Sequence, residues 1–161
     1  MKKESGAKGS KLLRKGRVSW SLALYWISAF KAEGAQTFDN QLCFQAILEQ
    51  ADQLEREGSL YCLAIVLMPD HLHMVARLGA EANLSKTMKR FKGASAFRIN
   101  QLRGTKGSVW YEGFHDHLLR PDQPPANFVK YLLQKPVKAG LVKNPFDWPY
   151  LKVKNFLLKD L

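Results

Sequence analysis

The chain has 161 residues, with 25 Lys or Arg against 14 Asp or Glu and a formal net charge of +11. This length predicts a single domain, and a hydrophobic content of 46% is enough for an ordinary core, which excludes a largely disordered chain. No apolar run approaches the roughly 18 residues of a membrane span, and two cysteines cannot form a disulfide scaffold, so we expect a cytoplasmic protein with no membrane partner. The positive charge favours an anionic partner, most commonly nucleic acid.

Positive charge is concentrated in two segments of the chain. Residues 1–17 form a basic arm with interspersed Gly and Ser, which we expect to be flexible. Residues 83–107 carry basic side chains and no acid, whereas acids collect between residues 37 and 58. This separation favours a binding face over a merely soluble surface. The candidate nucleic-acid contacts in the two segments are Arg14, Lys15, Arg17, Lys86, Lys89, Arg90, Lys92, Arg98 and Arg103.

The first predicted elements are a strand, a helix and a second strand. Residues 18–29 alternate between apolar and small polar side chains, which is typical of a strand. Asp39 or Asn40 can cap a helix that ends before Gly58. Residues 60–68 form a nearly continuous apolar run, and this indicates a buried central strand.

A hairpin, a second helix, a fourth strand and a third helix follow. Residues 71–78 alternate after a Pro-Asp turn and are expected to pair as a hairpin. Asn83 caps the second helix. After a glycine-rich break, residues 109–120 predict a strand with a kink, and the helix over 126–135 is expected to end because Pro136 cannot continue it.

The order of these elements predicts an α+β protein with the ferredoxin-like split βαβ arrangement. We expect a central antiparallel sheet with helices packed on one face, plus a C-terminal helix. Residues 18–150 would form the one folded domain, between the basic arm of residues 1–17 and a C-terminal tail of residues 151–161.

Two histidine pairs are the sharpest chemical feature of the sequence. His71 and His73 project from the same side of a strand because side chains alternate, and two imidazoles at this spacing can chelate one metal ion. Two solvated histidines on a sheet face are the alternative interpretation. His115 and His117 repeat the spacing in the next predicted strand, and both pairs would form one zinc site only if the fold brought them together.

Several short motifs follow one another in a specific order over roughly residues 25–150. They are Pro69-Asp70-His71-Leu72-His73, Phe91-Lys92, Val109-Trp110, Gly113-Phe114-His115-Asp116-His117, and Tyr131 leading to Pro136-Val137-Lys138-Ala139-Gly140-Leu141-Val142. Each motif alone is weak. Together they resemble the REP-associated tyrosine transposases, which are single-tyrosine relatives of the HUH nucleases.

This resemblance implies a bacterial enzyme that cuts and rejoins single-stranded DNA near hairpins, such as REP-like hairpins or transposon ends. In such enzymes the histidine pair, here His71 and His73, holds Mg²⁺ or Mn²⁺. A tyrosine on the following helix, here Tyr131, attacks the phosphorus and keeps a 5′-phosphotyrosine. The resemblance leaves open whether the protein is a monomer or a homodimer, with the tyrosine and histidines from one chain or two. We expect His115 and His117 to support this site.

The chain departs from the family's pattern four residues after the tyrosine. The family usually carries Asn or Gln there as a third metal ligand, but this chain has Lys135, and an ammonium group has no lone pair for a metal. Gln134 lies near the same helix face and is our candidate third ligand. Alternatively, Lys135 supplies part of the missing positive charge, or the chain is a nucleic-acid-binding protein that kept the fold. A phosphodiesterase that uses water in place of the tyrosine is a further possibility.

Trp110 has two interpretations. Aromatic residues of a sheet usually pack in the core, but exposed ones can stack on unpaired bases, so Trp110 is also a candidate DNA contact. Its exposure decides between the two.

Overall fold

The computed structural model describes residues 18–161, so the expectations for the arm of residues 1–17, with Arg14, Lys15 and Arg17, lie outside the described part. Its elements in chain order are β1 (Leu24–Phe30), α2 (Gln41–Arg56), β2 (Leu60–Leu67), β3 (His71–Leu78), α3 (Leu84–Arg103), β4 (His115–Leu118), α4 (Pro125–Leu133), α5 (Lys135–Lys138), η1 (Pro145–Asp147), β5 (Leu151–Val153) and η2 (Asn155–Asp160). The strands form one sheet in the order β4-β1-β3-β2-β5, with every pairing antiparallel. The predicted α+β class is confirmed.

Local capping explains where the two long helices begin and end. The side chain of Asn40 accepts a hydrogen bond from the Cys43 backbone N–H at the start of α2. Asn83 does the same for Lys86 at the start of α3. These bonds satisfy backbone donors that have no partner inside a helix. Gly104 then ends α3 in the left-handed region, at φ 65°.

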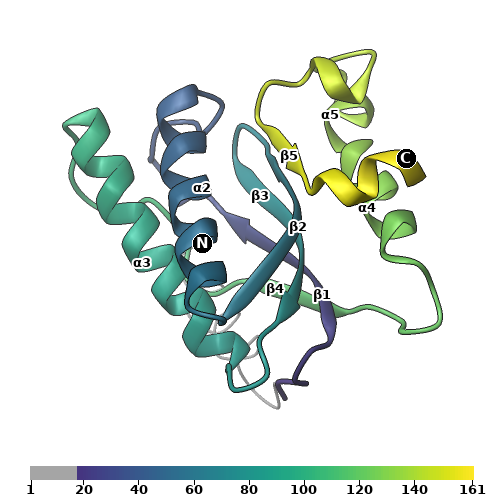
Figure 1. Cartoon of the computed structure of the whole chain (residues 1–161). Helices are drawn as coiled ribbons and strands as arrows, with labels where there is room; N and C mark the ends of the chain where they lie inside the picture. Colours follow the sequence, from purple (N-terminus) through teal and green to yellow (C-terminus); the bar gives the residue numbers. More distant parts are fainter. Residues whose placement is uncertain (1–17) are drawn as a thin grey trace, which may run out of the picture.

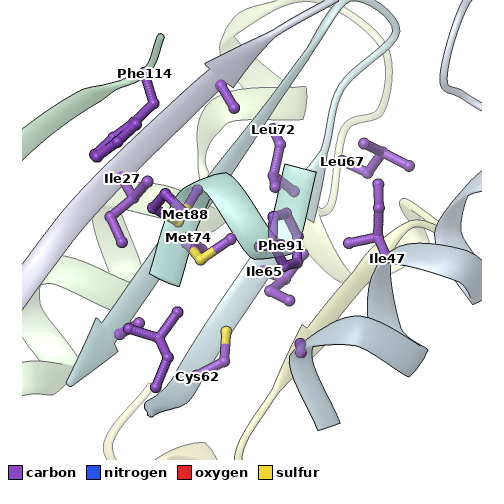
Figure 2. Packing of buried hydrophobic residues seen from close by; sticks show 14 of the residues in the cluster. Ile27, Ile47, Cys62, Ile65, Leu67, Leu72, Met74, Met88, Phe91 and Phe114 are labelled. Carbon is purple, nitrogen blue, oxygen red and sulfur yellow. The ribbon is translucent and has the colours of Figure 1, made fainter. Parts of the chain in front are cut away.

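The sheet separates two apolar layers. Side chains of β1, β2 and β3 pack with α2 and α3 on one face, around residues that include Ile27, Ile47, Met74 and Phe91 (Figure 2). On the opposite face, α4 packs against β2 and β3 and forms a second apolar layer, which also includes Trp148, Val153 and Leu157. In Figure 1, α2 and α3 lie on one side of the sheet, and α4 and α5 lie on the other. None of the described helices has the length and hydropathy needed to span a bilayer.

The first strand is shorter than expected. Residues 18–23 precede β1, and Leu22 has a φ of 61°, in the left-handed region. The Ala23 N–H donates to the Trp20 carbonyl at 3.2 Å, which closes a turn. Trp20 and Leu22 are exposed, so the apolar alternation before residue 24 does not reflect burial in a strand.

The strand expected over residues 109–120 is also reduced. Only His115–Leu118 pairs as β4, and Trp110 makes an isolated bridge with Lys31. Gly113, with a φ of 80°, separates the two. A residue in this conformation leaves the extended path, which explains the break.

The end of the chain differs from the expected helix and tail. Helix α4 stops at Leu133, before Pro136, and Pro136 is then accommodated in the first turn of the short helix α5. A proline is tolerated there because the first N–H groups of a helix have no internal partner. Residues 151–161 add the edge strand β5 and the segment η2, whose Leu157 is buried in the second apolar layer.

Gly79→Ala should destabilise the protein, because a Cβ at Gly79 would lie 1.9 Å from the Gly58 carbonyl oxygen. That neighbour is backbone and cannot move without shifting the turn after α2. Gly93→Ala is the matched control, since a Cβ in the interior of α3 at Gly93 meets no atom within 4 Å. We expect Gly93→Ala to raise the free energy of unfolding by about 0.5–1 kcal/mol. Urea unfolding of both variants tests this pair, and equal effects would contradict it.

Candidate metal and tyrosine site

The register of three strands places all four histidines on one face of the sheet. In β1, Phe30 is opposite His71 and Ser28 is opposite His73. On the other side of β1, Ser28 is opposite His115 and Trp26 is opposite His117. Directly opposite residues of antiparallel strands share a face. This is the face on which α4 packs, because Leu72 and Met74 point into the layer with α2 and α3.

The two histidines of β3 converge on one point. The Nε2 atoms of His71 and His73 lie 3.0 Å apart. The Nδ1 atom of His71 lies 2.5 Å from Oδ1 of Asp70. Because a carboxylate only accepts hydrogen bonds, the neutral imidazole of His71 carries its proton on Nδ1 and presents a lone pair at Nε2.

His73 is held by two polar groups of β1. Its Nδ1 lies 2.7 Å from the hydroxyl oxygen of Ser28 and 3.2 Å from the indole nitrogen of Trp26. Burial lowers the pKa of His73 to about 3, and electrostatic interactions with His71 and Lys135 act in the same direction. The imidazole is therefore neutral at neutral pH and can present a lone pair.

Tyr131 faces this site from α4 of the same chain. Its ring centroid lies 5.6 Å from that of Trp26, and Trp26 in turn lies 5.4 Å from His73. Tyr131 is 53% exposed, so the phenol is accessible to a substrate. Two ammonium groups flank the ring, with Nζ of Lys135 at 4.6 Å and Nζ of Lys138 at 4.5 Å from its centroid.

The two residues after α4 take different positions. Lys135 reaches the site, with Nζ 5.5 Å from the centroid of Trp26. Gln134 is the C-cap of α4 and is exposed, and among the described residues no contact joins its side chain to His71 or His73. Its role as a third metal ligand stays a prediction. Lys138, which the sequence analysis did not single out, also lies beside Tyr131.

The two imidazoles suit a metal ion that takes most of its ligands from water and substrate rather than from the protein. Within residues 18–161 there is no cluster of three or more His, Cys, Asp and Glu side chains that could hold a metal. The pair of β4 therefore does not join His71 and His73 in one zinc site, and β1 lies between them. Neighbouring ligands in an octahedral shell with bonds of about 2.0–2.1 Å are about 3 Å apart, which fits the Nε2 spacing. Mg²⁺ or Mn²⁺ would take its remaining ligands from water and phosphate oxygens.

His115 makes a different contact. Its ring lies 5.7 Å from that of Phe30, and Phe30 stacks on His71 at 5.5 Å. Phe30 thus lies between the two imidazoles, and His115 contributes to the surroundings of His71 through this ring. A supporting role for His115 and His117 stays a prediction.

Most basic residues of α3 have partners inside the protein. Arg90 forms an ion pair with Glu57, the C-cap of α2, and Arg98 pairs with Glu49 of α2 at 3.0 Å. Arg103 donates to the Thr37 carbonyl. These guanidinium groups connect α3 to the acidic helix beside it and are less available to a ligand than the sequence suggests.

Lys92 joins α3 to the loop before β4. Its Nζ donates to the carbonyls of Tyr111 at 2.7 Å and of Gly113 at 2.5 Å. Burial lowers the pKa of Lys92 to about 8. Lys86 and Lys89, by contrast, are exposed, and no contact of their ammonium groups is recorded in residues 18–161. They border a groove of about 740 Å³ between α3 and this loop.

Trp110 does not serve as an exposed stacking surface. It is 8% exposed, its indole N–H donates to the Ser95 hydroxyl at 2.9 Å, and its ring packs 4.7 Å from that of Phe38. Of the two interpretations of Trp110, core packing is the one that its burial supports. Its role as a DNA contact stays a prediction. The neighbouring Tyr111 is 43% exposed instead.

The sequence did not predict that Ser28 and Trp26 contact His73 or that Asp70 contacts His71. Asp70 stands beside His71 in the motif, which was a usable signal. Trp26 and Ser28 share a face of β1, but their register against β3 depends on contacts between distant segments and has no local signal.

Comparisons with known proteins assign the chain to a family. Residues 22–132 match the family model described as "Transposase IS200 like", and the chain belongs to this family.

Curated relatives carry names of the same kind. The chain is 31% identical over 98 residues to a Haemophilus influenzae protein assigned as a REP-associated tyrosine transposase, a match that covers 55% of this chain and 56% of the relative. It is 25% identical over 108 residues to the REP-associated tyrosine transposase of Escherichia coli, over 66% of this chain and 62% of that one. The chain thus matches about three fifths of the length of these relatives.

A solved structure of a REP-associated tyrosine transposase bound to a REP hairpin shares the fold. Its TM-score is 0.68 at 20% identity, covering 84% of this chain and 79% of that one. At this identity the likeness supports the α+β architecture alone.

Proposed function

We propose that this chain is a transposase that cuts and rejoins single-stranded DNA next to hairpins, with Tyr131 as the nucleophile. One observation carries the proposal. The Nε2 atoms of His71 and His73 converge to 3.0 Å on the sheet face where Trp26 contacts both His73 and Tyr131. The family assignment and the hairpin named for the related structure support the choice of substrate.

The proposed step is a transesterification. The phenolic oxygen of Tyr131 forms a bond to the scissile phosphorus while the bond from phosphorus to the preceding 3′ oxygen breaks. The phenol gives up one proton and the leaving 3′ oxygen takes one, so a 5′-phosphotyrosine and a 3′-hydroxyl result. Because the phosphoester bond is conserved, rejoining can follow by the reverse reaction.

The residues around Tyr131 have distinct tasks in this proposal. His71 and His73 would hold Mg²⁺ or Mn²⁺, which when bound neutralises charge on the phosphoryl oxygens. The ammonium groups of Lys135 and Lys138 both lie within 5 Å of the centroid of the phenol ring, at 4.6 Å and 4.5 Å. Positive groups fixed at that place stabilise the charge that develops during the attack.

The position of Lys135 also supports a second candidate function. Its ammonium lies where relatives of this family are expected to carry an amide ligand, and its charge disfavours a cation beside His73. A protein that binds hairpin DNA without cutting it is consistent with this feature.

Tyr131→Phe should abolish the covalent protein–DNA adduct, because phenylalanine has no nucleophilic oxygen. The assay is incubation with a labelled hairpin oligonucleotide and Mn²⁺, with and without EDTA, followed by a denaturing gel. Tyr61→Phe is the control, since Tyr61 is a partly exposed tyrosine of β2 and should retain the adduct. An adduct in Tyr131→Phe would refute the proposed nucleophile. Tight hairpin binding without an adduct in the unaltered protein would favour the second candidate.

Replacing both Lys86 and Lys89 by Ala should weaken hairpin binding and make it less sensitive to salt. If each contacts one phosphate, the slope of log affinity against log salt should fall in magnitude by about 1.4–1.8 in total. Arg98→Ala is the control, because Arg98 is paired with Glu49 and should leave the slope nearly unchanged. Fluorescence anisotropy at several salt concentrations gives the slope for each variant. A larger change of slope in Arg98→Ala than in the double lysine variant would contradict the assignment of Lys86 and Lys89 as phosphate contacts.

Lys135→Gln should raise the affinity for Mn²⁺. The change removes a positive charge that acts on His73 and supplies an amide oxygen. An effect of at least about 1 kcal/mol, or roughly fivefold, is expected, because this is the interaction of two unit charges about 4 Å apart in water. Lys138→Gln is the control, with a smaller effect, since Lys138 contacts the Tyr131 ring and not that of Trp26. Mn²⁺ titration followed by electron paramagnetic resonance measures both, and equal affinities would count against this account.

A further inference from the structure

We infer that Ser28 is a positioning residue whose hydroxyl lets His73 exchange one tautomer for the other when a divalent cation binds. The inference rests on the proposed function, which places the cation between His71 and His73. It concerns the side of His73 that faces away from the cation, where Ser28 and Trp26 of β1 contact Nδ1.

The tautomer of His71 is the starting point. Its Nδ1 lies 2.5 Å from the Asp70 carboxylate, which has no proton to give, so the proton belongs to His71 Nδ1. In the neutral imidazole, Nε2 of His71 is therefore an acceptor. The 3.0 Å contact between the two Nε2 atoms is a hydrogen bond only if His73 supplies the proton from its own Nε2.

This assigns the other nitrogen of His73 as well. A neutral imidazole has one N–H, so Nδ1 of His73 is an acceptor in the metal-free protein. It accepts from the Ser28 hydroxyl at 2.7 Å. The indole N–H of Trp26 lies 3.2 Å from both Nδ1 of His73 and Oγ of Ser28, so it can donate to either.

A cation bound by both Nε2 atoms requires the other tautomer of His73. Its Nε2 must then offer a lone pair, and the proton must reside on Nδ1. Trp26 cannot accept that proton in a hydrogen bond, because an indole N–H only donates. Ser28 can, because a hydroxyl both donates and accepts. The indole N–H then donates to Ser28, and His73 neither gains nor loses a proton overall.

Burial makes the serine hard to replace by solvent. Ser28 is 7% exposed and lies in the middle of β1, between β3 and β4. Without its hydroxyl, the one polar partner left to His73 Nδ1 within residues 18–161 is the obligatory donor Trp26. That contact fixes His73 in the tautomer that cannot bind the cation through Nε2.

The first experiment reads the tautomers directly. Long-range ¹H–¹⁵N spectra of the metal-free protein at neutral pH should show the proton on Nδ1 of His71 and on Nε2 of His73. Saturating Mg²⁺, which is diamagnetic, should move the His73 proton to Nδ1. A His73 that already carries its proton on Nδ1 without metal would overturn the inference.

The second experiment compares Mn²⁺ affinity in three variants without DNA. Ser28→Ala should weaken binding by roughly 10–100-fold, which is the usual effect of losing such an outer contact. Ser28→Thr keeps the hydroxyl and should restore most of the affinity. Trp26→Phe removes the competing donor and should leave the affinity equal or higher. Backbone spectra of each variant confirm that it is folded.

The outcomes separate this inference from the function on which it rests. If the unaltered protein binds Mn²⁺ and Ser28→Ala binds it equally well, the role of Ser28 is wrong while the metal site stands. If Ser28→Ala and Trp26→Phe weaken binding alike, the two residues merely pack against His73, and the inference also fails. If the unaltered protein binds neither Mn²⁺ nor Mg²⁺, the metal site of the proposed function is itself wrong.

Discussion

The pairing of β1 with β3 is the constraint on which the rest of the structure depends. β3 lies in the middle of the sheet, and its side chains alternate between two environments. Leu72 and Met74 enter the apolar layer under α2 and α3, and His71 and His73 emerge on the other face. A slip of one residue would bury the imidazoles and expose the core side chains, so the free energy of packing holds the polar site in register. The stability of the core and the placement of the candidate ligands therefore have one cause.

The charges show how a linear pattern can mislead. The acidic stretch and the basic stretch are separate in the sequence, which favoured a binding face made of the whole basic helix. In the folded chain α2 and α3 are neighbours, and Glu49 and Glu57 pair with Arg98 and Arg90. Exposed pairs of this kind contribute little to stability, but they occupy the guanidinium groups. Lys86 and Lys89 of α3 have no such partner among residues 18–161, and they border the groove between α3 and the loop before β4.

The sequence predicted the order of elements as far as α4 and the cap Asn83, and it offered Asn40 as one of two candidates for the other cap, because hydrophobic periodicity and capping side chains are local signals. It also predicted that His71 and His73 share a face, since alternation in a strand is a local property. It could not show that Ser28 lies opposite His73, because strand register is set by contacts between distant segments. Nor could it decide the exposure of Trp110, whose burial depends on packing against Phe38 and Ser95.

The two edges of the sheet have a consequence for how copies of this protein can meet. Both edge strands are short, with four residues in β4 and three in β5. Their side chains include Asp116, His117 and Lys152. Short and charged edges resist pairing with the strand of another molecule. Joining of two sheets edge to edge is therefore disfavoured at both β4 and β5.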